Sequence, residues 1–299
     1  MKGKSKMVEN TIKISLGAKL KAFYDLTKFR LSATVVFSAC IGYALASDHL
    51  NVGKMLLFAL ASFFTTAGAN VINQIIEKDL DVMMNRTKER PLPSGRISVQ
   101  EAKIFGFVIS MIAFAILYFE FNAKATALAA LSLILYGFVY TPLKRVGPVA
   151  VAVGALPGAF PPMIGWVAAS GHFGLEPGIL FAIQFFWQFP HFWAIAWVLD
   201  DDYRKAGFRL LPSKGGRDIN SAIQIMVYTL YLLPLCWVPY YLGMTGINSA
   251  VIAMVFGILF LAQTFLLMKR VDHKSALQLM FGSFIYLPVV QIAYLMDKI

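Results

Sequence analysis

Long apolar runs separated by short polar stretches dominate the chain. We scanned windows of about twenty residues, the length that a helix needs to cross a hydrocarbon core, and found nine runs that fill one. They follow neither the alternation of a strand nor an amphipathic helical rhythm. They predict membrane-spanning helices at 31–48, 55–76, 103–121, 125–141, 148–168, 178–199, 221–242, 248–268 and 276–296. Because no polar linker divides them, we expect an all-α, polytopic membrane helix bundle in one domain, residues 1–299.

Composition agrees with this pattern. Hydrophobic residues make up 58% of the 299 residues and charged residues 14%, where soluble domains carry about 25% charged residues. This excludes an ordinary soluble protein. Cys40 and Cys236 both lie in apolar runs, so we expect small buried side chains and no disulfide. Residues 1–30 are polar and basic without the short apolar core of a cleaved signal peptide, so the first span is expected to direct insertion.

The basic residues indicate an orientation. All of the 27 Lys and Arg residues except Lys54, Lys124 and Lys298 precede the first span or follow an even-numbered one. The positive-inside rule then places the N-terminal segment 1–30 in the cytoplasm and the C-terminus outside. The predicted location is the cell inner (cytoplasmic) membrane, with multiple passes. This asymmetry accounts for the net charge of +11, so we expect no nucleic-acid partner.

Three oxygen-bearing side chains recur every four residues where the second span ends. Asn73, Glu77 and Asp81 advance by about 40° and about 6 Å per step on a helix, so they share one face, and Asp79 points away from it. Two carboxylates and an amide oxygen are ligands suited to Mg²⁺ and its phosphate substrates. A solvated helix end with local pairs, such as Glu77 with Lys78 or Arg86, is the alternative. Asn73 favours the binding site, because an amide there is costly without a partner.

Basic residues follow this cluster and gather on the same predicted surface. Residues 86–96 contain prolines and a glycine, which predict a shaped loop rather than a helix. Arg86 and Arg90 in this loop could bind a diphosphate, since guanidinium groups match phosphate oxygens. Lys144 and Arg145 follow the fourth span and add a second basic pair.

The sixth span carries a polar stripe. Gln184, Gln188, His191 and Asp202 fall on one side of a continuous helix, because the eleven residues from 191 to 202 return it to within about 20°. Polar residues inside a span face the bundle interior or a cavity. His191 therefore either makes a hydrogen bond to a neighbouring helix or contacts an acceptor substrate. The aromatic residues around it could line an apolar cavity and stabilise a carbocation.

These features resemble the intramembrane (UbiA-type) prenyltransferase superfamily. Its members share Asn-x-x-x-Asp-x-x-x-Asp after the second span, which stands here as Asn73-x-x-x-Glu77-x-x-x-Asp81. Glu77 keeps the carboxylate of the usual Asp but lengthens its reach. The second motif of the superfamily, Asp-x-x-x-Asp after the sixth span, is not intact, and only the run Asp200, Asp201 and Asp202 can stand in for it.

Further segments are similar to the branch of the superfamily that forms heme O. They are Arg-Thr-x-x-Arg-Pro-Leu-Pro-Ser-Gly-Arg at 86–96, Tyr-Thr-Pro-Leu-Lys-Arg at 140–145, Gly-Ala-Phe-Pro-Pro-Met-Ile-Gly-Trp at 158–166, Gln-Phe-Pro-His-Phe-Trp at 188–193, and Asp-Asp-Tyr at 201–203 with Leu-Pro at 211–212. Together they cover the chain from the second span to just beyond the sixth.

The resemblance implies an activity: transfer of the farnesyl group of farnesyl diphosphate to the 2-vinyl group of protoheme IX with addition of water, giving heme O and diphosphate. It implies Mg²⁺ as cofactor, the lipid bilayer as surroundings, an active site facing the cytoplasm, and a downstream heme A synthase as a candidate partner. The implied residues are Asn73, Glu77, Asp81 and Asp202 as catalytic, the same four with Asp201 as metal ligands, Arg86, Arg90, Lys144 and Arg145 for the diphosphate, and His191, Gln188 and Tyr140 for the acceptor.

Two other functions are also compatible with these residues. One is the same prenyl transfer to a quinone precursor or another aromatic acceptor. The other is secondary transport, since transporters also place polar residues within helices. The carboxylates stand at the ends of spans rather than at the midplane, which favours the enzyme.

Overall fold

The computed structural model describes residues 15–299, and within them nine helical segments are long and apolar enough to cross a membrane. The predicted all-α fold and number of spans are thus confirmed for this part of the chain. The elements are α1 Leu16–Leu26, α2 Phe29–Ala46, α3 Val52–Asp81, α4 Val99–Glu120, α5 Ala123–Ile134, the π-helix η1 Leu135–Tyr140, α6 Thr141–Leu143, α7 Val149–Ser170, α8 Leu175–Val198, α9 Asp200–Lys205, α10 Ile219–Leu230, α11 Leu232–Leu235, α12 Val238–Tyr241, α13 Ile247–Arg270 and α14 His273–Met296.

The helix α3 is longer than its apolar run predicts. It begins at Val52, where the side chain of Asn51 accepts a hydrogen bond from Lys54 N at 3.0 Å, and it continues without a break to Asp81. Its 30 residues span about 45 Å at 1.5 Å per residue, whereas the hydrocarbon core is about 30 Å thick. The last turns, with Asn73 to Asp81, therefore extend beyond the apolar part of the bundle.

A short helix that the sequence did not predict, α1, precedes the first span. Ser15 caps it, accepting a hydrogen bond from Ala18 N at 3.3 Å. Lys28 separates it from α2 and has a left-handed backbone with φ of 47°. This conformation costs a residue with a side chain about 1–2 kcal/mol, and it turns the chain sharply at the start of the first span. The cytoplasmic location predicted for residues 1–30 concerns partly residues 1–14, outside the described region, and the orientation stays a prediction.

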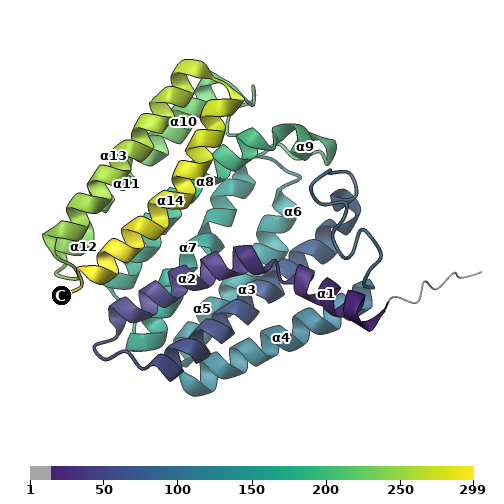
Figure 1. The fold of residues 1–299 in the computed structure, drawn as a ribbon, viewed down its shortest axis with the longest axis horizontal. Coiled ribbons are helices and arrows are strands. Elements are labelled where there is room, and N and C mark those ends of the chain that lie inside the picture. The colour runs from purple at the N-terminus through teal and green to yellow at the C-terminus, as the bar shows by residue number, and fades with distance from the viewer. Residues whose placement is uncertain (1–14) are drawn as a thin grey trace, which may run out of the picture.

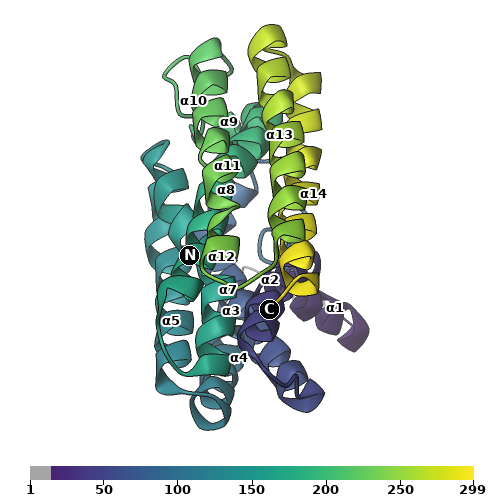
Figure 2. The ribbon, with the colours of Figure 1, turned by 90° about the vertical axis from the view of Figure 1, so that its left-hand side faces the viewer.

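The spans form a closed bundle. Helices α2, α3, α5, α7, α8 and α14 contact one another around its interior, and α4, α10 and α13 pack outside them (Figure 1). Figure 2 shows the bundle with α12 and the C-terminus toward the viewer. The short helices α1, α6 and α9 lie on the right-hand side of Figure 1, away from the C-terminus and α12. One end of the bundle thus gathers the segments that follow α3, α5 and α8.

Glycines allow α2 and α7 to cross in backbone contact. A Cβ atom on Gly42 would overlap the carbonyl of Pro162, and one on Gly165 would overlap the carbonyl of Ala39. Both cysteines are free, Cys236 buried and Cys40 half-buried, which confirms the prediction that they form no disulfide.

Candidate active site

Asn73, Glu77 and Asp81, which we call the oxygen stack, lie on one face of α3 as their spacing predicts. All three side chains are buried. Asp79, between them in sequence, points away, and its side chain is 84% exposed. Burial of two carboxylates is costly unless cations or hydrogen bonds compensate, so their partners decide what this face can bind.

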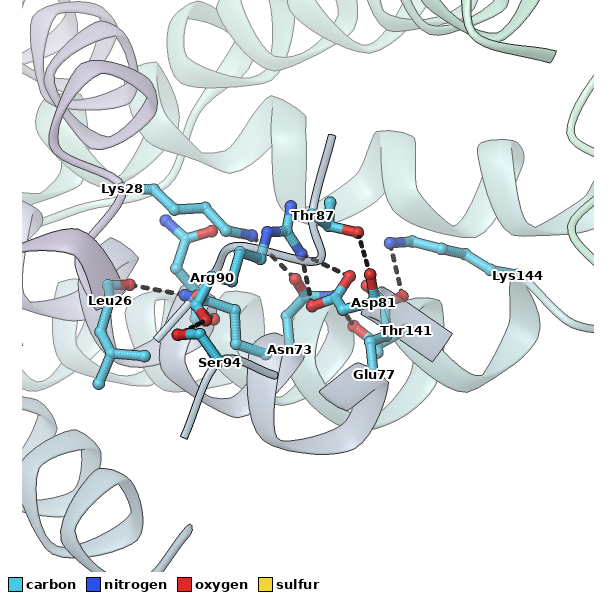
Figure 3. A network of polar contacts seen from close by, with 12 residues as sticks. Leu26, Lys28, Asn73, Glu77, Asp81, Thr87, Arg90, Ser94, Thr141 and Lys144 are labelled. Atoms are coloured by element: carbon cyan, nitrogen blue, oxygen red, sulfur yellow. Dashed lines mark hydrogen bonds and ion pairs between the residues drawn. The ribbon is translucent and has the colours of Figure 1, made fainter. Parts of the chain in front are cut away.

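Each member of the oxygen stack meets a different cation. Lys28 Nζ donates to Asn73 Oδ1 at 2.9 Å, and Lys144 Nζ lies 2.7 Å from Glu77 Oε1. Arg90 Nη1 lies 2.8 Å from both oxygens of Asp81. Figure 3 shows Lys28 and Lys144 reaching the stack from opposite sides. The local pair of Glu77 with Lys78, considered from sequence, is not formed, because Lys78 pairs with Asp79.

The loop after α3 places Arg90. Thr87 Oγ1 donates to the carbonyl of Asp81 at 2.8 Å, which folds the chain back over the end of α3. Ser94 Oγ donates to the carbonyl of Arg90 at 2.7 Å. These contacts agree with the shaped loop predicted for 86–96, and they turn Arg90 onto Asp81 rather than into solvent.

The π-helical turn η1 positions the residues on the other side of the site. Such turns often occur at functional sites. Thr141, which follows it, donates to the carbonyl of Tyr136 at 2.8 Å and accepts a hydrogen bond from Asn73 Nδ2 at 3.2 Å. One turn later the ammonium of Lys144 lies 5.0 Å from the centroid of the Tyr140 ring, a cation–π distance. The turn therefore orients the amide of Asn73 and brings Lys144 to Glu77.

The site holds more positive than negative charge. Burial, and then the nearby cations of Arg90 and Lys144, lower the pKa of Lys28 well below its usual value. Burial alone would lower the pKa of Lys144, but the Glu77 carboxylate outweighs it and the pKa of Lys144 is raised. Three basic side chains face two carboxylates, so an added anion would favour the charged form of Lys28 and relieve the repulsion from Arg90 and Lys144.

The chemistry of the oxygen stack fits Mg²⁺, which prefers carboxylate and amide oxygens together with water and substrate phosphates. Glu77 Oε1 is buried and receives no hydrogen bond of good geometry, although the Lys144 ammonium is near. This leaves a carboxylate oxygen with coordination capacity. Within residues 15–299, no three His, Cys, Asp or Glu side chains gather closely enough to form a metal site. A metal role for the stack stays a prediction.

The second acidic run lies against the loop after α3. Asp202 accepts hydrogen bonds from the backbone N–H groups of Asn85 at 2.9 Å and Arg86 at 3.2 Å, and Lys205 pairs with it at 3.0 Å. Burial alone would raise the pKa of Asp202, but these donors lower it. Asp202 thus anchors the loop that carries Arg90.

The other two acids of this run pair with arginines. Asp200 pairs with Arg204 at 2.7 Å, and Asp201, whose side chain is 81% exposed, pairs with Arg217 at 3.0 Å. Roles for Asp201 and Asp202 as metal ligands stay predictions.

The alignment of Asp202 with His191 on one stripe is wrong. It assumed a continuous helix, but α8 ends at Val198, and a separate helix, α9, begins at Asp200. Leu199 between them leaves the helical conformation, with φ of −101° and ψ of 11°. Gln184, Gln188 and His191 therefore face the bundle interior, whereas Asp202 faces the loop after α3.

A cavity of about 730 Å³ occupies the bundle interior beyond the oxygen stack, a size typical of ligand sites. Its wall on α3 includes Thr66 and Asn70, about two turns and one turn before Asn73 on the same face, so wall and stack are continuous. No charged residue of 15–299 lines it. Exposed apolar side chains on α2 and α14, such as Leu31 and Phe284, also belong to its lining, so it opens between these helices on the lipid side.

A proline in α7 accounts for the hydrogen bonds of two glutamines that line this cavity. Pro162 has no N–H to donate to the carbonyl of Gly158, four residues earlier. Gln184 Nε2 and Gln188 Nε2 donate to that carbonyl instead, at 2.7 and 2.9 Å. Gln184 Oε1 also accepts from Ser38 Oγ at 2.6 Å. Both glutamines therefore link α8 to α7 and line the cavity with their amide nitrogens already bonded, and Gln184 also contacts α2.

The remaining predicted residues lie in different places. His191 lines the cavity, but Tyr140 does not; Tyr136, one turn earlier, does. The ring of Tyr140 packs against Gly154 and under Lys144. Arg86 and Arg145 are exposed near the site. The acceptor and diphosphate roles of these residues stay predictions.

Sequence reasoning missed Lys28 and Thr141. Both contact Asn73, and they lie 45 and 68 residues from it in sequence. Lys28 was counted only among the basic residues of the N-terminal segment, and Thr141 only as part of a motif. No spacing within the chain identifies either contact.

The comparisons with known proteins agree with this architecture. The model of the UbiA prenyltransferase family matches residues 35–287. Protoheme IX farnesyltransferase of Cytophaga hutchinsonii is 54% identical over 288 residues, 95% of this chain and all of the relative. The protein of that name from Christiangramia forsetii is 44% identical, over 93% of this chain and 94% of the relative.

Solved structures share the fold. A digeranylgeranylglyceryl phosphate synthase has a TM-score of 0.78 and 24% identity, covering 93% of this chain and 98% of that one. A UbiA homologue from Archaeoglobus fulgidus bound to DMAPP and Mg²⁺ has a TM-score of 0.70 and 16% identity, covering 92% and 99%. The chain belongs to the UbiA prenyltransferase family.

Proposed function

We propose that this protein transfers the farnesyl group of farnesyl diphosphate to the 2-vinyl group of protoheme IX, with addition of water, giving heme O and diphosphate. Several relatives that match along nearly the whole chain are protoheme IX farnesyltransferases. One structural observation carries the proposal: the oxygen stack, with its basic partners, and the uncharged cavity lie along one continuous face of α3. Such a face suits a substrate with an anionic head and a long apolar tail.

The reaction exchanges the bond between farnesyl and diphosphate for a bond between farnesyl and the vinyl group. The bond between farnesyl C1 and the diphosphate oxygen breaks, and the electron pair leaves with the diphosphate. C1 then bonds to the outer carbon of the vinyl group, which leaves a cation on the inner carbon beside the ring. Water adds to that cation and loses a proton. The product gains one farnesyl group and one hydroxyl group.

The residues of the site supply binding and charge stabilisation. Lys28, Arg90 and Lys144 would turn from the oxygen stack toward the diphosphate and stabilise it as it leaves. The stack would hold Mg²⁺, which supplies Lewis-acid neutralisation of the leaving group. The uncharged wall of the cavity would exclude water until the cation has been captured.

The site and the opening of the cavity would each face a particular side of the protein in the membrane. The oxygen stack and the loop after α3 would face the cytoplasm, as the positive-inside rule predicts, and the protein would lie in the inner membrane. The farnesyl tail and the porphyrin would enter from the bilayer between α2 and α14, since exposed apolar residues on both helices belong to the cavity lining.

The proposal can be tested in membranes that contain the protein. They are incubated with protoheme, farnesyl diphosphate and Mg²⁺, and the extracted hemes are examined by mass spectrometry. We expect a heme heavier by one farnesyl group plus one hydroxyl group, and its absence after EDTA. An unchanged heme, from protein that remains monodisperse in detergent, contradicts the proposal, and quinone precursors would then be tested as acceptors.

A further inference from the structure

His191 is the one histidine among the residues that line the cavity, and its ring is held in a fixed orientation. It lies on α8, buried within the bundle. Trp187 stacks on it with ring centroids 4.2 Å apart and an interplanar angle of 18°, and the ring of Phe284 meets it edge-on at 5.0 Å. These contacts leave the ring little freedom to rotate.

The hydrogen bonds around His191 determine which ring nitrogen carries the proton. His191 Nδ1 lies 2.8 Å from Ser283 Oγ on α14. Ser283 Oγ donates its hydrogen to the carbonyl of Met280 at 2.6 Å. A hydroxyl has only one hydrogen to donate, so Ser283 must accept from His191, and Nδ1 carries the proton.

The other nitrogen, Nε2, then carries a lone pair. No group of residues 15–299 makes a hydrogen bond to it, and the ring belongs to the cavity wall. A second contact fixes the serine, because Trp187 Nε1 donates to the carbonyl of Ser283 at 3.0 Å. A histidine whose Nδ1–H is bonded, and whose Nε2 faces a ligand space, has the arrangement of a metal-ligating imidazole.

We propose that His191 Nε2 is the axial ligand of the iron of the protoheme substrate. The proposal rests on the proposed function, which places protoheme in this cavity. No Cys or Met, and no second His, of residues 15–299 lines the cavity. With His191 on one face of the iron, the opposite face of the porphyrin would be free for the farnesyl chain. Ligation would fix the height of the porphyrin plane above α8.

Titration with two porphyrins tests this ligation directly. The purified full-length protein in detergent is titrated with iron protoporphyrin IX and with metal-free protoporphyrin IX, and the same is done with His191→Ala. We expect the variant to bind the iron form at least about tenfold more weakly, as for loss of a ligand or its partner. Its affinity for the metal-free form should change less than twofold, which also checks that the cavity is intact.

Two further observations make the assignment specific. Wild-type protein should give the absorption and electron paramagnetic resonance spectra of five-coordinate, histidine-bound heme, and added imidazole should restore them in His191→Ala. In Ser283→Ala the ligand remains but its orienting partner is lost. We expect that variant to weaken binding of the iron form selectively, by about 10-fold to 100-fold.

The alternatives give different results. Equal loss of both porphyrins in His191→Ala would mean that the side chain only shapes the cavity. Loss of turnover with unchanged heme spectra would mean that Nε2 accepts a proton from water. Either result overturns ligation and leaves the proposed function standing. Wild-type protein that binds neither porphyrin would overturn both.

Discussion

Each oxygen group of the stack faces a cation from a different part of the chain: Lys28 before the first span, Arg90 after the second and Lys144 after the fourth. Because these cations pair with the groups that would hold a metal, metal and diphosphate would have to arrive together. The metal would replace the basic side chains at the oxygens of the stack, and these side chains would then pair with the diphosphate. This exchange keeps the buried charges compensated throughout.

The proposed metal role of the oxygen stack depends most on the carboxylate of Glu77. Glu77→Gln keeps the size of the side chain but removes its charge. We expect activity to fall at least about 100-fold, because metal stabilisation of a leaving group is worth several kcal/mol. The farnesylation assay measures it. Asp79→Asn, two residues away on the exposed side of α3, is the matched control and should retain activity. Near-normal turnover of Glu77→Gln would remove the metal role.

Substitution of Lys28 tests whether this residue has an unfavourable backbone conformation because its side chain binds the diphosphate. Glycine adopts the left-handed conformation without steric cost, which offsets the loss of the hydrogen bond to Asn73, so Lys28→Gly should be about as stable as the parent protein. It should nevertheless raise the KM for farnesyl diphosphate about tenfold or more, the effect of losing one charge-assisted hydrogen bond.

Steady-state kinetics and thermal unfolding in detergent measure the two effects separately. Lys21→Ala, at an exposed position of α1, is the control. An unchanged KM with raised stability would show that Lys28 has no part in binding the diphosphate.

Sequence predicts the members of this site unevenly. Asn73, Glu77 and Asp81 are four residues apart on one helix, so helical geometry alone places them on one face. Lys28 and Thr141 reach Asn73 only through the packing of three segments. Gln188 bonds to Gly158 because Pro162 leaves that carbonyl without its helical donor. Such contacts follow from the fold and not from spacing.

At the scale of helices, the spans could be predicted and their ends could not. Nine runs of hydropathy correspond to nine segments, since a bilayer demands long apolar helices. The last turns of α3 are polar, so hydropathy ended the span at 76, although the helix continues to Asp81. The break at Leu199 between α8 and α9 has no proline or glycine to announce it. The assumption of a continuous helix therefore failed there.

The crossing of α2 and α7 gives a prediction about packing. Gly42→Ala inserts a methyl group where the carbonyl of Pro162 already lies. Overpacking of this kind costs typically about 1–3 kcal/mol, so we expect a clearly lower unfolding temperature in detergent. Gly178→Ala on α8 has open space around it and should be neutral or slightly stabilising, as alanine is the better helix former. Equal stability of the two variants would contradict the close crossing.

For the whole molecule, the orientation in the membrane follows from the distribution of charge and can be tested by labelling. Cys40 and Cys236 are first replaced by alanine, and single cysteines are then introduced as Lys88→Cys and Lys124→Cys, both at exposed positions. A membrane-impermeant maleimide should label position 124 in intact cells and position 88 only in inside-out vesicles. The reverse pattern would place the oxygen stack outside the cytoplasm.

The close crossing of α2 and α7 also has a consequence for the exchange of substrate and product with the bilayer. The lipid-side opening of the cavity lies between α2 and α14, and α2 cannot move without losing its backbone contacts with α7. Widening of that opening therefore falls to α14. Pro288 gives this helix a point of easy bending, because it donates no hydrogen bond to the carbonyl of Phe284. The release of a bulky product, the slow step in many enzymes, would thus depend on the last helix of the chain.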